Sequence, residues 1–433
     1  MLSRRSLLQL AVAPRGLRVA TFSADVTPPL GAALCYGLVP VASSIADPLS
    51  ARGVVLWPSG QLPIVLCAVD WLGIGNHSRD RWRAALAKAA GTVPDRVALH
   101  TVHQHDAPGD DATAQALLAS GVALGPDAFA LQTVAKVARA VRLAKPVAVT
   151  SVTAGAVPVV DVASNRRILG GDGKVQFGRM TACRNSPLCH APVGVIDPLL
   201  RSVSFWAGPR RYATLSYYAT HPMSYYGQGA VSADFVGHAR NQQTDTFQVH
   251  FTGAAGNIGT GKFNDGAVAM RPVLAERMAA AMAGAKEAEK QIPFTDVRWI
   301  SVPVALPLRT GAGFSEADLT TELTDPKQRL NQARYLAYYR LTKAGRKIDL
   351  SALRLGSVSI VHMPGELFVE YQLAAAAERP SEMVATAAYG DYGPMYIGTR
   401  PSYDEGGYET SAVSRVGPDV EDVLRNATRQ LLA

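Results

Sequence analysis

Short apolar runs alternate with stretches of helical periodicity from one end of the chain to the other. The runs Gly53–Leu56 and Pro63–Val69 flank the turn Pro58-Ser59-Gly60, which predicts a β-hairpin. Between Arg298 and Leu306, large aliphatic residues recur at every second position, as is typical of a half-buried strand. Helical periodicity predicts a helix that begins near Ser78, helices over Ala128–Lys145, Val273–Glu289 and Lys327–Lys343, and a C-terminal helix with an apolar stripe from Val420 to Leu431.

This alternation favours an α/β fold over separate α and β domains. We expect mixed β-sheets flanked by helices, and two packed sheets in an αββα-type sandwich are one such arrangement. The 433 residues contain no internal repeat and no low-complexity linker, and 48% of them are apolar. Residues 17–433 are therefore expected to form one large domain, preceded by residues 1–16 as a separate segment.

The N-terminal segment resembles an export signal. Ser3-Arg4-Arg5-Ser6 is followed by the short apolar run Leu7–Ala13, as in a degenerate twin-arginine signal. An N-terminal tail is the alternative. We expect export to the periplasm or the exterior, and a cytoplasmic location is left open. No run of about 20 apolar residues predicts a transmembrane helix, and peripheral membrane contact is also left open.

The charged residues and the cysteines exclude some classes of protein. The 43 Lys and Arg residues against 35 Asp and Glu give a net charge of +8, but the basic residues are scattered, so a nucleic-acid partner is not expected. Cys35 and Cys67 lie in apolar contexts and are predicted to be buried thiols. Cys183 and Cys189, followed by His190, fit a disulfide, half of a metal site or two structural thiols, and the sequence leaves these open.

Candidate catalytic residues follow three predicted strands directly. His103-Gln104-His105 follows Arg96–Val102, His221 follows Tyr212–Ala219, and Glu366 follows Ser357–Val361. Loops at strand ends carry ligands and catalytic groups in α/β folds. Two histidines and a glutamate match the ligand set of catalytic zinc. The simpler alternative is that backbone carbonyl groups satisfy these histidines.

Several other polar segments are candidates for the same site. His105 lies on the same side of an extended chain as His103, so one imidazole can bind metal and the other substrate. Arg166 precedes a glycine-rich turn and can pair with a carboxylate or an anionic group. Ser232-Ala233-Asp234 follows the second histidine and can orient it. The loop Thr252–Gly261 lacks the dinucleotide-binding pattern, so its glycines predict a close backbone approach to metal or substrate. The Tyr-rich segment Tyr389–Tyr408 is predicted to line the site.

Taken in order, these segments resemble the N-terminal catalytic domain of the neutral/alkaline, non-lysosomal ceramidase family. The resemblance covers about residues 17–420. The matching segments are Ala24–Gly31, Asp70, His103-x-His105-x-x-Pro108-Gly109, Asn165-Arg166, Ala219-Thr220-His221-Pro222, Ser232-x-Asp234, Pro364-Gly365-Glu366 and Tyr408-Glu409.

The resemblance implies a zinc-dependent amidohydrolase with one Zn²⁺ per chain. Its substrate would be N-acylsphingosine or a related N-acyl compound, attacked by metal-bound water. His105 and Arg166 match residues that contact the substrate or its developing oxyanion. The residues in the metal-ligand positions are His103, His221, Glu366 and Tyr408.

Two departures from the family pattern leave other functions open. Gly259 stands where ceramidases carry a serine with an assigned catalytic role, and Thr260 is its neighbour. The chain also ends soon after the tyrosine motif, so the C-terminal β-sandwich domain of the family is not expected. The alternatives are a catalytically retired, ceramidase-like protein that binds a lipid or glycan, and a metalloamidase or esterase with a non-lipid substrate.

Overall fold

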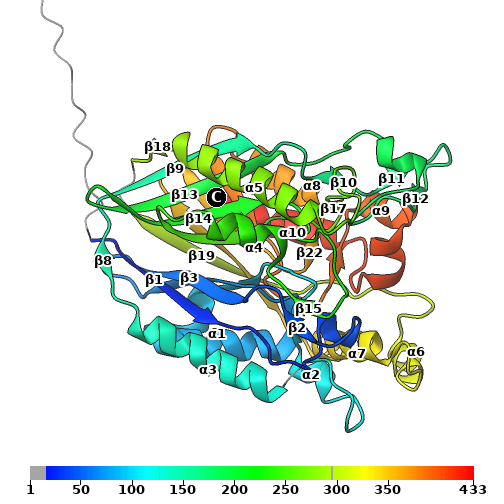
Figure 1. Ribbon diagram of the computed structural model, residues 1–433. Helices are drawn as coiled ribbons and strands as arrows, with labels where there is room; N and C mark the ends of the chain where they lie inside the picture. The colour runs from blue at the N-terminus through cyan, green and yellow to red at the C-terminus, as the bar shows by residue number, and fades with distance from the viewer. Residues whose placement is uncertain (1–15, 126, 294–295) are drawn as a thin grey trace, which may run out of the picture.

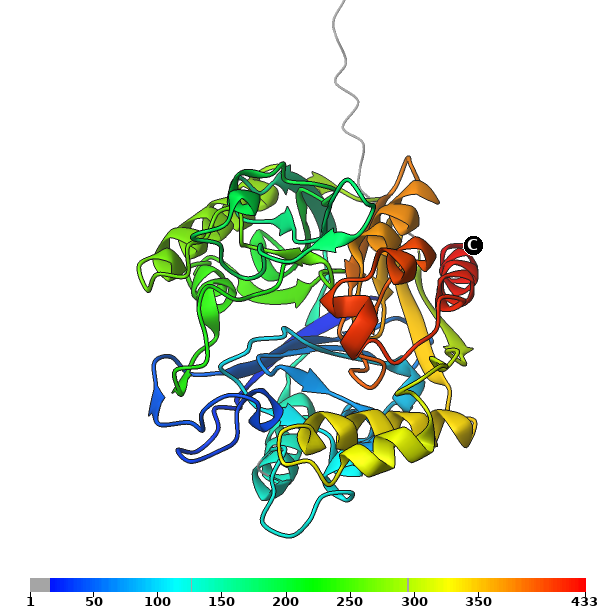
Figure 2. The ribbon, with the colours of Figure 1, turned by 90° about the vertical axis from the view of Figure 1, so that its right-hand side faces the viewer.

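The computed structural model describes residues 16–125, 127–293 and 296–433, so almost all of the predicted N-terminal signal lies outside the described residues. Within them, three larger sheets occupy three sectors around a common centre (Figures 1 and 2). Helices cover the outer side of each sheet. The α/β fold and the single large domain expected from the sequence agree with this arrangement. The core contains three larger sheets, one more than the αββα sandwich named above as one such arrangement.

The first sheet contains the predicted hairpin. Its strands in spatial order are β6 (Val97–Thr101), β4 (Ile64–Val69), β3 (Ser50–Trp57), β1 (Arg18–Asp25) and β8 (Val147–Ala148). Strands β3 and β4 are antiparallel, which confirms the hairpin, whereas β4 and β6 are parallel. Helices α1 (Asn76–Ala90) and α3 (Asp127–Leu143) cover this sheet, below it in Figure 1. Strand β6 ends directly before the loop that carries His103 and His105.

The second sheet carries the second histidine and the glycine-rich loop. Its strands are β16 (Phe247–Thr252), β14 (Arg210–Tyr218), β13 (Leu199–Ala207), β9 (Ser151–Pro158) and β18 (Lys290–Gln291). Helices α4 (Asp234–Asn241) and α5 (Met270–Glu287) are the helices on this side of the molecule. Because β14 and β16 are parallel, His221 and the loop after Thr252 emerge at the same edge.

The third sheet carries the glutamate. Its strands are β19 (Val297–Val304), β20 (Ile348–Leu355), β21 (Val358–His362) and β23 (Met383–Ala387). Helices α8 (Val369–Ala377) and α10 (Val420–Leu432) pack on it, while α6 (Glu316–Glu322) and α7 (Arg329–Lys343) lie between β19 and β20 in the chain. Strands β21 and β23 are parallel, so Glu366 and the Tyr-rich segment also emerge together. The five predicted helices correspond to α1, α3, α5, α7 and α10.

Two-residue strand pairs fasten the loops to one another at the ends of the sheets. These pairs are β2 (Ser44–Ile45) with β15 (Ala230–Val231), β5 (Gly73–Ile74) with β7 (Gly109–Asp110), β10 (Ser164–Asn165) with β17 (Ile258–Gly259), β11 (Ile168–Leu169) with β12 (Val175–Gln176), and β22 (Glu366–Leu367) with β24 (Tyr396–Ile397). The remaining short helices are α2 (Ala112–Gln115), α9 (Arg400–Glu405), the 3₁₀ turns Cys35–Gly37, Pro94–Arg96 and Pro187–His190, and the π-turn Glu409–Val413. The pairing satisfies backbone hydrogen-bonding groups of these loops and ties them to one another.

The cysteines divide as the sequence allowed. Cys183 and Cys189 form a disulfide, one of the three alternatives left open above. Cys35 and Cys67 are free and buried, as predicted, and burial raises the pKa of the Cys35 thiol to about 12. None of the helices in the described ranges combines the length and the apolarity that a bilayer crossing requires.

Candidate functional site

The three strand ends that carry the predicted ligands meet in one place. One ligand atom each from His103, His221 and Glu366 lies within 4.8 Å of the other two, and all three residues are buried. Each residue comes from the end of a different sheet. The predicted convergence of His, His and Glu is therefore confirmed. It depends on how the three sheets pack.

The hydrogen bonds of the two histidines determine which ring nitrogen is available. His103 Nδ1 lies 2.7 Å from the carbonyl oxygen of Leu72, and His221 Nδ1 lies 2.7 Å from that of Ala255. A carbonyl only accepts, so each Nδ1 donates, and in a neutral ring Nε2 then carries a lone pair. Backbone carbonyls thus satisfy one nitrogen of each ring, as the simpler alternative had it. They leave the Nε2 atom of each ring to face the site.

Both Nε2 atoms face one carboxylate oxygen. Glu366 Oε2 is 3.0 Å from His221 Nε2 and 3.3 Å from His103 Nε2, and the latter atom is buried without a hydrogen bond. Burial would raise the pKa of Glu366, but its contacts with His103 and His221 outweigh burial and hold this pKa well below its usual range. Burial, together with the Arg166 charge, lowers the pKa of His221, which favours the neutral ring.

Three lone pairs therefore point at one small volume inside the protein. One shared positive charge satisfies all three, whereas the same atoms without it repel each other in a buried place. Two imidazole nitrogens and one carboxylate oxygen are the donor set of catalytic zinc sites with an open position. The residues present thus fit a divalent metal ion, as the sequence predicted for this group.

The backbone around the ligands is strained. His103 has φ of 77°, Tyr389 of 62° and Met395 of 57°, in the left-handed region that non-glycine residues rarely adopt. Tyr389 stacks on the His103 ring with centroids 4.4 Å apart, and Met395 accepts a hydrogen bond from the backbone N–H of Glu366. Strain of this kind persists where the surroundings over-determine a conformation, and it is concentrated at functional sites.

His105 lies beside the ligand cluster, as predicted for a residue that contacts substrate. Its ring centroid is 4.7 Å from that of His103 and 5.0 Å from that of the half-exposed Tyr226. Its Nδ1 donates to the backbone carbonyl of His103 over 3.2 Å, so Nε2 is the nitrogen left available. Burial and the neighbouring histidines hold the pKa of His105 well below its usual value, which keeps the ring neutral.

Arg166 is also placed at the site. Its Nε donates to Glu409 Oε1 over 2.6 Å, its Nη2 donates to the carbonyl of Gly256 over 2.7 Å, and its guanidinium lies over the Tyr396 ring. The expected pairing with a carboxylate thus takes place inside the protein, with Glu409. Arg167 binds the other oxygen of the same carboxylate.

Two tyrosines that the sequence did not single out lie within 3.5 Å of a proposed ligand. The hydroxyl of Tyr396 is 3.5 Å from His221 Nε2, and that of Tyr392 donates to Glu366 Oε1 over 2.6 Å. Tyr408 is 42% exposed, and its ring meets the edge of the Tyr396 ring. Its predicted role as a metal ligand stays a prediction. The Tyr-rich composition marked this segment as lining the site, but the pairing of Glu366 with Tyr396 across β22 and β24 decides which phenols come close.

The glycine-rich loop approaches the site closely, as predicted. A Cβ at Gly256 would lie 2.2 Å from the backbone oxygen of Glu366. Gly259 lies against the Met180 backbone, where a Cβ would be 3.2 Å from its carbonyl oxygen. Thr260, the neighbour of the missing serine, is fully buried, and its hydroxyl donates to the Thr181 carbonyl over 2.8 Å. It is therefore unavailable as a nucleophile.

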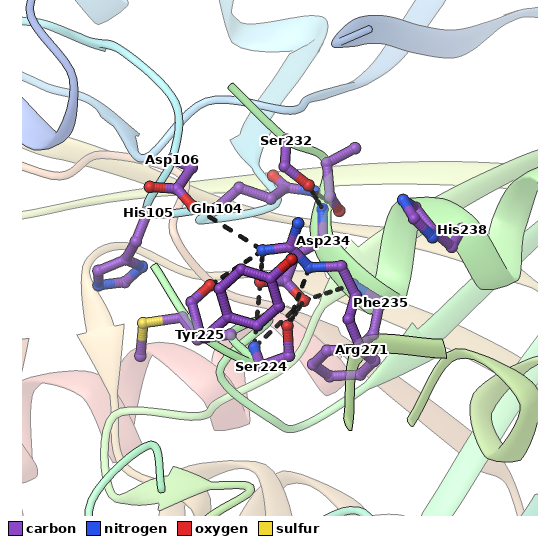
Figure 3. Close-up of polar contacts among 12 residues, drawn as sticks. Gln104, His105, Asp106, Ser224, Tyr225, Ser232, Asp234, Phe235, His238 and Arg271 are labelled. Atoms are coloured by element: carbon purple, nitrogen blue, oxygen red, sulfur yellow. Dashed lines mark hydrogen bonds and ion pairs between the residues drawn. The ribbon is translucent and has the colours of Figure 1, made fainter. Parts of the chain in front are cut away.

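Asp234 binds the loop that follows His221 (Figure 3), and none of its hydrogen bonds within the described residues reaches the His221 ring. It accepts hydrogen bonds from the backbone N–H and the hydroxyl of Ser224. Arg271 lies between Asp234 and Asp106, at 3.4 and 3.8 Å, and donates to Ser224 Oγ over 3.0 Å. The expected orienting role is therefore indirect: this cluster ties the loop of His105 to the loop of His221.

Comparisons with known proteins identify the fold. Searches against protein-family models and among curated proteins found no match. Among solved structures, the neutral ceramidase from Pseudomonas aeruginosa matches with a TM-score of 0.69 and 18% identity, over 97% of this chain and 74% of that one. A structure described as ceramidase complexed with C2 matches with a TM-score of 0.70 and 17% identity, over 97% and 75%. The chain thus has a neutral ceramidase-like fold.

Proposed function

We propose that this protein is a zinc-dependent hydrolase that cleaves the amide bond of an N-acyl lipid of the ceramide type. One observation carries the proposal: two imidazoles with their Nδ1 atoms bound to carbonyls present both Nε2 atoms to one oxygen of Glu366. That arrangement suits a shared cation. The ceramidase structures that share the fold support an amide as the bond cleaved.

His103, His221 and Glu366 would hold the metal, and Tyr396 is the phenol best placed to join them. When bound, a zinc ion supplies a Lewis acid for a carbonyl oxygen and lowers the pKa of a water molecule. Tyr408, the residue that the resemblance placed among the ligands, is the alternative phenol. Tyr408, which is 42% exposed, also suits a contact with substrate at the mouth of the site.

The other residues of the site would orient the amide and move protons. His105, neutral and with Nε2 available, would accept the proton that the attacking water loses and return it to the leaving amine. The guanidinium of Arg166 would face the negative charge that develops on the carbonyl oxygen. Since Gly259 has no hydroxyl and that of Thr260 is committed, water is the nucleophile that these residues favour.

The disulfide between Cys183 and Cys189 supports an exported protein, because such bonds persist in oxidising compartments. We therefore place the protein in the periplasm or outside the cell, where it would meet lipid amides at membrane surfaces.

The test measures bound metal and turnover on the same preparation. We expect the purified protein to hold one zinc per chain by elemental analysis and to release the fatty acid from an N-acylsphingosine. The variant His103→Ala should lose both properties. The matched control His77→Ala, which removes an exposed histidine of α1, should retain both.

Each other outcome separates the alternatives. Zinc without turnover of N-acylsphingosine, but with hydrolysis of other amide or ester reporters, would indicate a metalloamidase or esterase with a non-lipid substrate. Zinc without any hydrolysis would indicate a retired binding protein. Full zinc occupancy in His103→Ala would contradict the ligand assignment.

A further inference from the structure

The two oxygens of Glu366 have different partners. Oε2 faces His103 Nε2 and His221 Nε2 at 3.3 and 3.0 Å. Oε1 accepts a hydrogen bond of 2.6 Å from the hydroxyl of Tyr392, which is 5% exposed. Only Oε2 is therefore directed at the histidines. The carboxylate is turned so that its second oxygen is occupied by the protein.

The ring of Tyr392 is held in a cradle formed by the Tyr36 ring and the Arg334 guanidinium. It stacks on Tyr36 with centroids 5.8 Å apart and planes 9° apart, and Tyr36 in turn donates its hydroxyl to the carbonyl of Gly73 over 2.7 Å. The buried guanidinium of Arg334 lies 4.0 Å over the Tyr36 ring and 5.2 Å over that of Tyr392.

Two glycines make the room for this pair of rings. A Cβ at Gly73 would lie 2.5 Å from the Tyr392 ring, and one at Gly109 would lie 2.4 Å from the Tyr36 ring. Because the two glycines pair with each other across β5 and β7, the floor of the cradle is continuous backbone. The hydroxyl of Tyr392 is thus held in one position, where it donates its hydrogen bond to Glu366 Oε1.

His103, His221 and Glu366 are fixed in the same manner. The far nitrogen of each histidine is bound to a carbonyl, and the far oxygen of Glu366 is bound to Tyr392. Each side chain is left with one near atom to offer. Outer partners of this kind orient metal ligands and tune the affinity of the site.

We propose that Tyr392 is a positioning residue that sets the metal selectivity of this site: it holds Glu366 to a single donor oxygen and so favours a zinc-like ion over a larger, oxygen-preferring one. Zinc takes few ligands, with nitrogen and oxygen donors in tetrahedral geometry. Manganese prefers six donors that are mostly oxygen, and a carboxylate free to offer both oxygens suits it better. The proposal rests on the metal site of the proposed function.

The experiment compares metal affinities of the stripped protein, without reference to its activity. The full chain and its Tyr392→Phe variant are titrated with Zn²⁺ and with Mn²⁺ in competition with a chromophoric chelator. We expect the variant to bind zinc about 10- to 100-fold more weakly. The affinity for manganese should fall less, because the freed Oε1 becomes a second donor. The ratio of manganese affinity to zinc affinity should therefore rise about tenfold or more.

Tyr389→Phe is the matched control. Tyr389 belongs to the same segment, is fully buried and stacks on a proposed ligand, but its hydroxyl has no hydrogen-bond partner. Its variant should leave the affinity ratio unchanged. If Tyr392→Phe does not fold, Gly73→Ala displaces the same ring while keeping the hydroxyl, and the same rise in the ratio is expected.

Two results would overturn the proposal. Equal weakening of both metals in the variant would mean that Tyr392 only supports the local structure. Unchanged affinities would mean that its hydrogen bond does not act on the site. Both differ from failure of the proposed function, in which the unmodified chain itself binds neither metal.

Discussion

The close approach of Gly256 to Glu366 permits a sharp test of the site. Gly256 donates its backbone N–H to Leu367, and its own carbonyl accepts from Arg166. A Cβ added there would lie 2.2 Å from the Glu366 carbonyl oxygen and 2.9 Å from its carbon. Gly256 does not have a left-handed φ, so an alanine at this position is opposed by contact and not by backbone conformation.

The size of the effect follows from these distances. An ordinary contact begins near 3.4 Å, so either the glycine-rich loop or the backbone of Glu366 must move by about 1 Å. Forcing extra atoms into a packed interior costs about 1–3 kcal/mol. Because a chain of this length loses about 1 °C of Tm per kcal/mol, the melting temperature should fall by only about 1–3 °C. A displacement of about 1 Å at a site residue can cost about 100-fold in function.

Gly256→Ala should therefore remain folded but lose zinc affinity by about 100-fold, with a matching loss of any hydrolytic activity. Zinc affinity is measured by competition with a chelator and stability by thermal unfolding, both on the same preparation. Gly171→Ala is the control, because no atom lies within 4 Å of the added Cβ and the residue is exposed. If Gly256→Ala binds zinc as tightly as the unmodified chain, the loop does not position Glu366.

Two further predictions concern pH and the fourth ligand. Burial raises the pKa of Asp106 from 3.8 to about 6, against the pull of the Gly227 N–H and of Arg271. The folded protein therefore holds this proton more tightly than the unfolded chain does. As pH rises from about 4 to 7, the free energy of unfolding should fall by up to about 3 kcal/mol. Relative to the unmodified chain, Asp106→Asn should gain stability over that interval in denaturant titrations, and a constant difference would refute the assignment. For the fourth ligand, Tyr396→Phe should weaken zinc binding more than Tyr408→Phe, because the Tyr396 hydroxyl lies 3.5 Å from His221 Nε2. The opposite order in a chelator competition would restore Tyr408 as the ligand.

The local elements were predictable because their causes are local. The aliphatic alternation of β19 and the turn between β3 and β4 are written in consecutive residues. The positions of His103, His221 and Glu366 directly after predicted strands can likewise be seen in consecutive residues. Parallel strands place their carboxyl ends at one edge, so the pairing of β14 with β16 makes His221 and the glycine-rich loop neighbours.

The number of sheets was not predictable in this way. Each sheet buries one face under its own helices and the other against its neighbours, and a two-layer arrangement satisfies the same apolar pattern. Which tyrosine lies opposite Glu366 depends on the register in which β22 pairs with β24. Tyr396 opposes Glu366 across a two-residue strand pair, and nothing within Tyr389–Tyr408 distinguishes it from the other phenols.

The sequence by itself determined the α/β class, most element positions and the identity of three converging groups, His103, His221 and Glu366, because short-range patterns and residue chemistry suffice for these. Only the tertiary structure decided the geometry among them. The three ligands are more than 100 residues apart in the chain, and the sheets that bring them together are held by packing contacts that no local pattern encodes. The tertiary structure also decides which groups bind Nδ1 of the two histidines and Oε1 of Glu366, as Tyr392 does for Glu366. A hydrogen bond depends on position in space and not on order in the chain.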